Sequence, residues 1–519
     1  MLAFALCLTL LLFAAWILWA RRPVSRGAQT LPPGPKPIPL MGNIFDMPTS
    51  CEWETFSRWG QIYGELVYVT IFGRRMVILN TAEVANDLLE KRSAIYSDRP
   101  NFPLVDLAGH STFNFGFMPY GKRWQLCRHL FASQFGRTTA NVVESCQFAA
   151  SSLLQNLLRD PGDLVNHLRL HSGQLILDAT YGIPISSRED KFIKTAEKVM
   201  GTISIAVSPA MWIINPVLLC KSSLVLRDVS LLNDLAQYLP GWLGGNYLIR
   251  KGHQWRADVH DLRTDPFEQT KASMAAGTAK ASFITNLLEQ SESIDGPGLE
   301  REEMIKDCAA VAFGGTSLFS PSTFFLALMA NPHVQTKAQE EIDRIVGPDR
   351  LPMLVDRPRL PYVTAVLKET LRWHPPAPQG IPHLLTTDDH YKGYTIPAGT
   401  MVIGNIWGIL HDPAVYRRPL DFNPDRYLPS GILDVSTNDP SRVAFGFGRR
   451  VCPGKVLAED ALWLTMAQIL SVYTIRSPPG IEFVKPQFTS GAISHPLPFL
   501  CDITPRSEAA EALIHNLVL

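Results

Sequence analysis

The spacing of apolar residues predicts helices along most of the chain. Apolar side chains three or four positions apart recur from Asn331 to Val346, from Tyr362 onward, and from Val456 to Tyr473. Pro332 lies at the start of the first stretch, and Pro375 and Pro376 lie beyond the end of the second. Helices tolerate proline at both kinds of position.

A longer stretch, from Glu300 to Met329, predicts a single helix. Acidic residues in its first turn suit the positive end of a helix dipole. Pro321 removes a backbone donor inside this stretch, so we expect a kink there.

Strand patterns are few and short. Leu66–Phe72 and Arg75–Leu79 predict a hairpin that turns at Gly73. A second strand pair is predicted for Tyr391–Pro397 and Gly399–Ile403, with its turn at Pro397-Ala398-Gly399.

Residues 2–20 form a nineteen-residue run without a charge. At about 1.5 Å per residue this run just spans a hydrocarbon core of ~30 Å. A cleaved secretory signal is the alternative, and it predicts basic residues before the run. Here Arg21, Arg22 and Arg26 follow it instead, which favours an uncleaved transmembrane anchor over residues 1–20 with the bulk of the protein in the cytosol.

A basic and proline-rich segment occupies residues 21–44. Its five prolines between Pro32 and Pro39 exclude helix and central strand and predict a stiff, extended spacer. The spacer is either an ordinary linker or a hinge that orients the protein against a bilayer. No further linker or repeat divides residues 45–519, which we interpret as one large domain.

Charge and cysteine usage narrow the class of protein. Lysine plus arginine and aspartate plus glutamate each total 48, so bulk charge predicts no nucleic-acid partner. The chain is 46% hydrophobic and 18% charged, which suits a large core with some membrane contact. Its eight cysteines are scattered without zinc-like pairs, which indicates a reducing compartment.

One cysteine stands in a distinctive loop. Cys452 lies in Phe445–Gly454, among glycines and arginines and directly before the helix predicted from Val456. Helix N-termini favour a thiolate over a thiol. Arg450, two residues before Cys452, can form an ion pair with a carboxylate. Taken alone, a free cysteine is more often a buried, inert side chain.

The full pattern Phe-x-x-Gly-x-Arg-x-Cys-x-Gly resembles the haem-binding loop of the cytochrome P450 superfamily, whose cysteine thiolate is the axial ligand of the haem iron. Further motifs agree in order along the chain: Trp124-x-x-x-Arg128, Glu369-x-x-Arg372 and Phe-x-Pro-x-Arg426. The resemblance implies a mostly α fold with a small β lobe, a P450 fold carrying an N-terminal transmembrane helix.

The resemblance also implies residue roles. Cys452 would ligate the iron of haem b, and the other haem-binding residues would be Arg450, Trp124, Arg128, His383 and Phe445. Glu369, Arg372 and Arg426 would form a structural triad that supports the cysteine loop. For His383, a propionate contact and a ring satisfied by backbone remain equal alternatives.

The centre of the 300–329 stretch departs from the family pattern. Related enzymes place an acid before a threonine here, to manage protons for bound dioxygen. This chain reads Gly314-Gly315-Thr316-Ser317, with glycine where the acid is expected. Thr316 is the predicted catalytic residue, and the alternative for it is a threonine that only bonds to the helix backbone. Proton delivery runs through Thr316, Ser317 and water, or is poor. A faulty gene model is another explanation of the missing acid.

The resemblance implies a membrane-anchored monooxygenase of the endoplasmic reticulum, with its domain facing the cytosol. It would insert one oxygen atom from dioxygen into a hydrophobic small molecule, such as a terpenoid, an aromatic polyketide or a polycyclic aromatic xenobiotic. Electrons would come from NADPH through NADPH–cytochrome P450 reductase, with cytochrome b5 as an optional second donor. Membrane lipid is the other expected partner.

Two alternatives remain open at the level of sequence. A haem-thiolate isomerase or dehydratase needs no proton relay, which the glycine at 315 allows. A haem-binding protein without turnover needs neither NADPH nor oxygen. The cysteine loop and the Pro382–Pro397 region look most like the fungal branch associated with secondary metabolism and aromatic oxidation.

Overall fold

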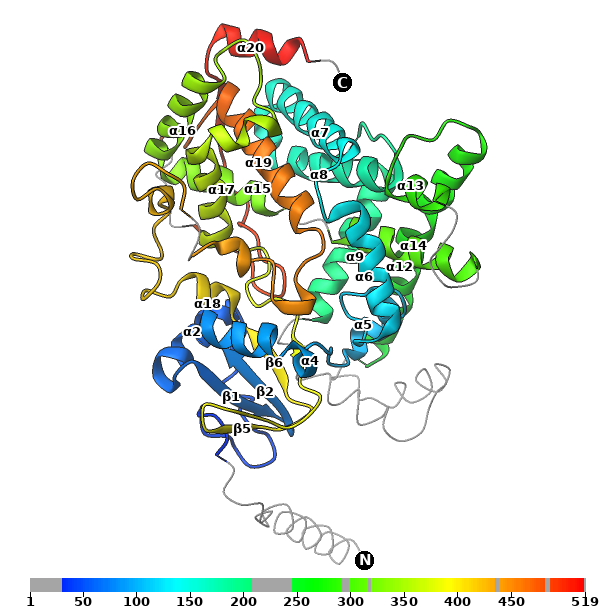
Figure 1. Ribbon diagram of the computed structural model, residues 1–519, viewed down its shortest axis with the longest axis vertical. Helices are drawn as coiled ribbons and strands as arrows, with labels where there is room; N and C mark the ends of the chain where they lie inside the picture. Colours follow the sequence, from blue (N-terminus) through cyan, green and yellow to red (C-terminus); the bar gives the residue numbers. More distant parts are fainter. Residues whose placement is uncertain are drawn as a thin grey trace, which may run out of the picture.

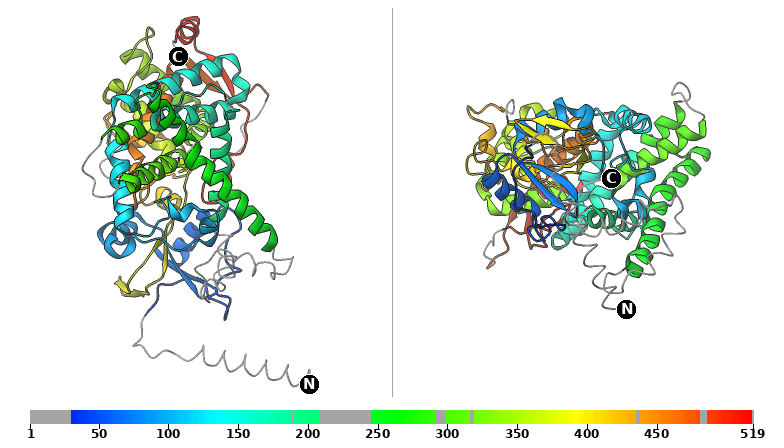
Figure 2. Two further views of the ribbon diagram at one scale, coloured as in Figure 1. Left: turned by 90° about the vertical axis from the view of Figure 1, so that its right-hand side faces the viewer. Right: turned by 90° about the horizontal axis from the view of Figure 1, so that it is seen from below.

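The structure is a computed structural model that describes residues 30–187, 189–207, 245–290, 298–315, 319–434, 438–480 and 486–517. It is mostly helical with small sheets, as expected. A lobe of strands lies at one end, and the helices fill the remainder (Figure 1). The same separation is visible in the view turned about the vertical axis (Figure 2).

The largest sheet joins distant parts of the chain in the order β1-β2-β6-β3. The predicted hairpin is confirmed, because β1 (Leu66–Ile71) pairs antiparallel with β2 (Arg74–Leu79). β6 (Met401–Gly404) runs parallel to β2, and the two-residue β3 (His383–Leu384) closes the far side of the sheet. In a separate two-stranded sheet, β7 (Tyr473–Arg476) pairs antiparallel with β8 (Asp502–Pro505).

The second predicted strand pair is wrong in its partners. β4 (Asp389–Tyr391) pairs with β5 (Tyr394–Ile396), so the hairpin turns at Lys392 and Gly393 rather than around Gly399. Both turn residues have positive φ, 47° and 82°, as a two-residue hairpin turn requires. The segment after Gly399 becomes β6 and pairs with β2 instead.

The helices predicted from apolar spacing are confirmed within a residue or two. The prediction from Asn331 corresponds to α16 (Pro332–Ile345), the one from Tyr362 to α17 (Pro361–Trp373), and the one from Val456 to α19 (Lys455–Val472). The other long helices are α2 (Glu52–Tyr63), α6 (Lys122–Phe135), α7 (Ala140–Arg159), α8 (Leu164–Tyr181), α9 (Lys191–Ala206) and α12 (Gly245–Ala275). Shorter helices are α3 (Ala82–Ala85), α4 (Ser93–Tyr96), α5 (Pro103–Leu107), α13 (Phe283–Glu289), α18 (Ile406–Leu410) and α20 (Glu508–His515).

The prediction of one long helix over 300–329 is wrong. α14 (Gly298–Gly314) ends before a turn at Gly315, and α15 (Phe319–Ala330) begins a new helix. Pro321 is the third residue of α15 as the structure describes that helix, and the first turn of a helix tolerates proline. The expected kink inside one continuous helix is therefore not observed among the described residues.

The main core is built around α19, which packs against α7, α16 and α17. Its Trp463 is fully buried, and the indole N–H donates to Thr364 Oγ1 on α17 at 3.0 Å. α19 follows directly after the cysteine loop, so this packing fixes the position at which the loop ends.

Membrane insertion was predicted for residues 1–20, which lie outside the described residues together with residues 21–29 of the 21–44 spacer. Among the helices that the structure does describe, none has both the length and the apolar character needed to cross a bilayer.

Candidate functional site

The cysteine loop is closed by a backbone hydrogen bond. The N–H of Cys452 donates to the carbonyl oxygen of Phe445 at 2.7 Å. Between them Gly446 and Gly448 have φ of 80° and 56°, a region that side chains other than glycine rarely adopt. The loop therefore returns on itself and presents Cys452 just before α19 begins.

The two glycines that the pattern treats alike have different surroundings. A Cβ on Gly448 would lie 2.0 Å from the carbonyl oxygen of Leu89, in the π-helix η1 (Asn86–Lys91). Gly454 has an ordinary φ of −88°, and the nearest atom to a Cβ there is Phe131 Cε1 at 4.0 Å. Only Gly448 lets the loop dock closely against another element.

The Cys452 side chain is exposed to solvent, and the protein atoms around its sulfur raise the pKa of the thiol through desolvation. The Gly454 N–H, Arg128 and Lys455 all act in the opposite direction and lower it. The N–H at the helix end thus acts in the predicted direction against burial, and the thiolate itself stays a prediction.

Arg450 is buried beside this loop and is held by backbone. Its guanidinium donates to the carbonyl oxygens of Ser97 (2.7 Å), Phe115 (3.1 Å) and Met118 (2.9 Å). The group also lies over the Trp124 ring, 4.5 Å from its centroid. Burial lowers the pKa of Arg450 to about 10. Carbonyl oxygens and an aromatic ring thus orient the charge, and no carboxylate of the described residues pairs with it.

A second buried arginine, Arg99, completes this group, and sequence reasoning missed it. It donates from Nε to Gly116 O at 2.9 Å and from Nη1 to Ile381 O and Pro382 O, both at 2.7 Å. Burial and the nearby Arg450 charge lower its pKa well below the usual value. Nothing in its local sequence marked it, because its partners come from distant loops.

Trp124 and Arg128 share one face of α6, as their spacing predicts. The Arg128 guanidinium lies 5.9 Å from the centroid of the Trp124 ring. Burial lowers the pKa of Arg128, and the nearby Cys452 sulfur opposes that shift. Because Arg450 stacks on the same indole ring, α6 and the cysteine loop together bring three predicted site residues to one place.

His383 lies in β3 and is satisfied by backbone. Its Nδ1 is 2.8 Å from the carbonyl oxygen of Tyr96, and a carbonyl can only accept, so Nδ1 carries the proton. Burial, followed by Arg99, lowers the pKa of His383 well below its usual value and keeps the ring neutral. In this state Nε2 has no hydrogen to offer a carboxylate, which favours the backbone alternative over the propionate contact.

Glu369, Arg372 and Arg426 form one buried cluster. Arg372 donates from Nε and Nη2 to the two oxygens of Glu369, each at 2.8 Å. Arg426 Nε lies 3.1 Å from both oxygens, and the Asn423 N–H donates to one of them at 2.8 Å. Other N–H groups of the two arginines reach carbonyls of the same surrounding loops, those of Leu410, Arg417, Pro419 and Asp421.

The comparisons with known proteins agree with this geometry. The family model described as cytochrome P450 matches residues 32–502. The chain belongs to the cytochrome P450 family.

Its relatives are fungal cytochrome P450 monooxygenases. It is 39% identical to cytochrome P450 monooxygenase 208 of Postia placenta, over 97% of this chain and 96% of that protein. It is 38% identical to the monooxygenase claR of Ampulloclitocybe clavipes, over 93% and 88%, and 37% identical to eriA of Hericium erinaceus, over 93% and 90%. The chain is therefore a monooxygenase of this family, and the family implies a haem group.

The residues present fit a haem. A haem has two propionate carboxylates, which need cationic hydrogen-bond donors. It also has an iron, which needs an accessible ligand atom from the protein. Within the described part of the chain, Arg99, Arg128 and Arg450 make no ion pair with a carboxylate, and the nearby Asp98 accepts backbone N–H groups instead. The buried guanidinium groups of Arg99 and Arg450 and the half-buried one of Arg128, none of them paired with an anion among the described residues, match this requirement together with the exposed Cys452.

The predicted catalytic Thr316 lies outside the described residues, as does Ser317. The helix before them ends with the Gly315 N–H donating to Val311 O at 2.9 Å. The end of α14 at Gly314, which the sequence did not predict, therefore lies just before the predicted Thr316 and Ser317.

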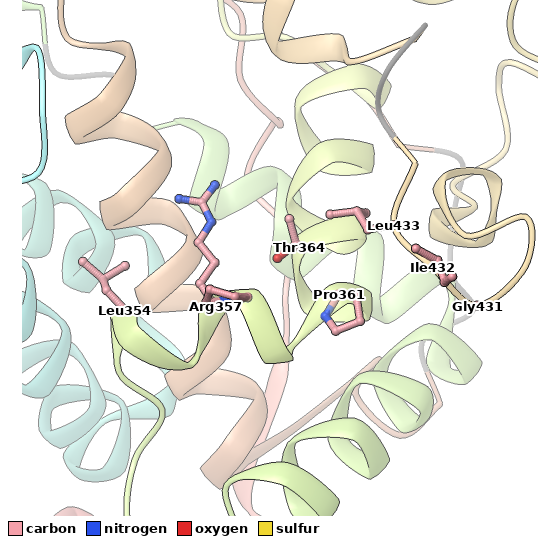
Figure 3. Close-up of a pocket in the computed structure, with 8 residues that line it drawn as sticks. Leu354, Arg357, Pro361, Thr364, Gly431, Ile432 and Leu433 are labelled. Carbon is pink, nitrogen blue, oxygen red and sulfur yellow. The ribbon is translucent and has the colours of Figure 1, made fainter.

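A hollow of about 580 Å³ lies elsewhere, between the 3₁₀-helix η6 (Leu354–Arg359), α17 and the loop at 431–433 (Figure 3). Its lining includes Arg357, which is paired with Asp460 of α19 at 2.8 Å. None of the predicted haem-binding residues lines it, so this hollow is separate from the site at Cys452.

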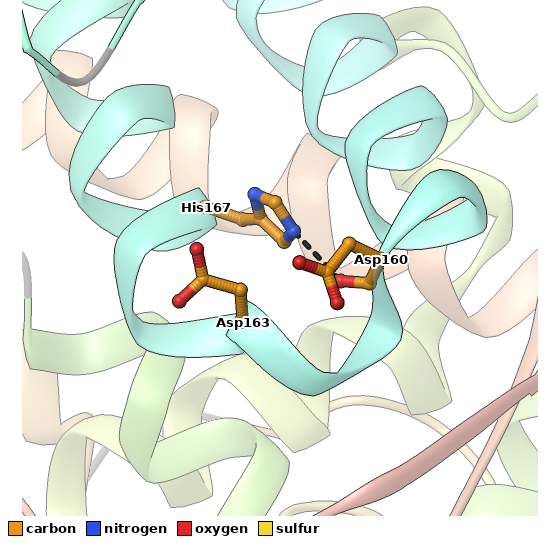
Figure 4. A group of neighbouring side chains, drawn as sticks. All are labelled: Asp160, Asp163 and His167. Carbon is orange, nitrogen blue, oxygen red and sulfur yellow. Dashed lines mark hydrogen bonds between the residues drawn. The ribbon is translucent and has the colours of Figure 1, made fainter.

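A group of metal-ligating side chains occurs where α7 meets α8. Asp160, Asp163 and His167 bring one ligand atom each to within 4.8 Å of the others (Figure 4). His167 Nε2 lies 2.8 Å from the Asp160 carbonyl oxygen, and Asp163 accepts from Asn166. These partly or fully exposed side chains serve the local turn, and we assign no metal to them.

Proposed function

We propose that this monooxygenase binds haem b through Cys452 and inserts one oxygen atom from dioxygen into a hydrophobic small molecule. The single supporting observation is the exposed Cys452 thiol near buried guanidinium groups that contact no carboxylate among the described residues. A terpenoid, an aromatic polyketide or a polycyclic aromatic compound is the proposed substrate. NADPH supplies electrons through a separate reductase, with cytochrome b5 as an optional donor.

Each residue around the group has a defined task. When bound, the haem supplies the redox centre at which dioxygen is activated. Cys452 would hold the haem iron through its sulfur, and Arg99, Arg128, Arg450 and Trp124 would hold the propionates. Phe445 holds the cysteine loop closed through its carbonyl oxygen.

The Glu369–Arg372–Arg426 cluster supports the segment of chain that precedes the cysteine loop. Arg372 and Arg426 bind backbone carbonyls before the cysteine loop in the chain, and Glu369 joins the two guanidinium groups. Because every member is hydrogen-bonded, the cluster is a rigid support that performs no proton transfer.

Proton delivery is assigned to Thr316, assisted by Ser317 and water. Gly315 supplies no carboxylate, so a hydroxyl must donate the proton directly or through water. Gly315→Asp tests this assignment against the isosteric, uncharged Gly315→Asn. Faster turnover in the aspartate variant alone shows that the missing acid limits the wild type, and robust, equal turnover shows that the missing acid is not limiting.

Membrane attachment through residues 1–20, in the endoplasmic reticulum, is also proposed. Several exposed apolar side chains follow the spacer or lie within it, which suits a surface next to a bilayer. They are Leu31, Ile38, Leu40 and Phe45.

The decisive experiment is a carbon monoxide difference spectrum of the reduced protein, expressed in microsomes with a reductase. We expect the red-shifted Soret band of a thiolate-ligated haem, and its loss in Cys452→Ala but not in Cys501→Ala. Survival of the band in Cys452→Ala overturns the ligand assignment. NADPH-dependent product from a terpenoid and aromatic panel then separates oxygenation from isomerisation or simple haem binding.

A further inference from the structure

One carboxylate, that of Asp98, lies next to the guanidinium groups of the proposed haem site. Asp98 is half-buried, and its Oδ1 accepts the backbone N–H groups of Arg99 and Tyr120, each at 2.9 Å. Its own carbonyl oxygen accepts from the Leu384 N–H at 2.9 Å. Hydrogen bonds to its own turn, to the 114–120 loop and to β3 therefore fix the position of Asp98.

The backbone around Asp98 contacts both buried arginines of the site. Arg99 follows Asp98 directly, and the carbonyl oxygen of Ser97, directly before it, accepts from Arg450 Nε at 2.7 Å. The ring of Tyr120, whose N–H Asp98 holds, has its centroid 6.0 Å from the Arg450 guanidinium. The carboxylate is thus tied by short connections to the groups that would bind the propionates.

The charges of the site act on one another. Burial and then the Arg450 charge lower the pKa of Arg99. The Asp98 charge raises this pKa, and the Arg128 charge lowers it. Within the described part of the chain, Asp98 forms no ion pair with a single partner, so its charge acts on the arginine group as a whole. Three guanidinium groups and one carboxylate carry two net positive charges, which the two propionates of a bound haem neutralise.

We propose that Asp98 is the charge-balancing residue of the haem site, whose carboxylate makes the loaded site electrically neutral and lowers the reduction potential of the haem iron. This role rests on the proposed haem binding. Reduction adds one electron, and therefore one negative charge, to the site. A fixed negative charge nearby opposes that step, and the low dielectric around buried groups strengthens the opposition.

Substitutions separate the charge of Asp98 from its hydrogen bonds. Asp98→Asn keeps an oxygen that can accept both N–H groups and removes the charge, whereas Asp98→Glu keeps the charge on a longer side chain. Asp388→Asn is the matched control. The Asp388 side chain is exposed and also accepts a backbone N–H, that of Ala398 at 2.7 Å, but it lies outside the arginine group.

The experiment is a spectroelectrochemical titration of the purified full-length holoenzyme without substrate. We expect Asp98→Asn to raise the ratio of ferrous to ferric haem several-fold at a fixed electrode potential, while Asp98→Glu and Asp388→Asn stay close to wild type. Transfer of haem to an acceptor globin should also slow several-fold in Asp98→Asn, because the propionates then face an excess of positive charge. Neither measurement requires turnover.

The outcomes distinguish charge from geometry. Equal potentials in wild type and Asp98→Asn, at equal haem content, overturn the role of Asp98 and leave haem binding intact. A shift in Asp98→Glu as large as that in Asp98→Asn overturns it as well, because altered geometry would then be the cause. Asp98→Ser, a second neutral variant, takes the place of Asp98→Asn if the latter loses its haem. Absence of haem from the wild type overturns the proposed function, and the role of Asp98 with it.

Discussion

At the scale of single residues, buried charges are the most constrained feature of this protein. Glu369 and Arg372 are fully buried, and their ion pair is surrounded by further hydrogen bonds. The pair Arg418–Asp421 has the same i, i+3 spacing, but the Arg418 side chain is 77% exposed. Identical spacing therefore gives a rigid support in one place and a solvated pair in the other.

We expect Glu369→Gln to destabilise the protein by about 3–5 kcal/mol, because two buried guanidinium groups lose their anion. Arg418→Ala should change stability by about 0–1 kcal/mol, as exposed pairs do. Urea unfolding followed by fluorescence measures both variants. A small effect of Glu369→Gln would contradict the assignment of a supporting role to this cluster.

Arg99→Met should release haem faster, on the order of tenfold or more, because a charge-assisted hydrogen bond contributes about 1.5–3 kcal/mol. The measurement is haem transfer from the purified protein to an excess of an acceptor globin. Arg92→Met is the control, since Arg92 is paired with Asp389 at 2.7 Å and lies outside the cationic group. Equal rates in the two variants would remove Arg99 from the propionate site.

At the scale of elements, the cysteine loop depends on its contact with η1. The approach of Gly448 to the Leu89 carbonyl leaves no space for a side chain, and its φ of 56° excludes most residues. The break between α14 and α15 follows similar logic, because Gly315 and Pro321 are residues that favour helix ends.

Gly448→Ala should prevent stable docking of the loop and reduce haem content several-fold. The positive φ costs roughly 1–2 kcal/mol, and the clash adds to it. Gly454→Ala should retain nearly full haem content, since its Cβ meets only Phe131 at 4.0 Å. Haem per protein, from absorbance and the carbon monoxide spectrum, distinguishes the pair, and similar losses in both would contradict the docking argument.

At the scale of the whole molecule, burial of histidines couples folding to pH. Burial lowers the pKa of His110 to about 4, and that of His374 and His411 to about 3. Below pH 6.5, the ordinary pKa of histidine, these side chains are protonated in the unfolded chain but stay neutral in the folded protein. Stability is therefore complete above that pH and falls as the pH drops from 6.5 towards 4.

His110 gives the cleanest test, because neither ring nitrogen has a hydrogen-bond partner within the described residues. Its buried neutral ring should cost about 2 kcal/mol of stability at about pH 5 relative to about pH 7. His110→Phe should reduce the pH dependence of the urea midpoint by that amount while keeping the aromatic contacts with Phe113 and Phe117. An unchanged pH dependence would show that His110 is not buried as a neutral ring.

The sequence by itself determined what depends on near neighbours in the chain. Apolar spacing predicted α16, α17 and α19, the i, i+3 spacing paired Glu369 with Arg372, and the loop pattern identified Cys452. In each case the interacting groups lie within one turn of helix or one short loop, so local geometry specifies them.

Only the tertiary structure decided what depends on distant segments. β6 pairs with β2 across more than half of the chain, and Arg99 joins Arg450 through carbonyls of three separate loops. The contact between Cys127 and Cys308 exists only because α6 packs on α14. Such contacts arise from the burial of whole elements, a property that no single stretch of sequence contains.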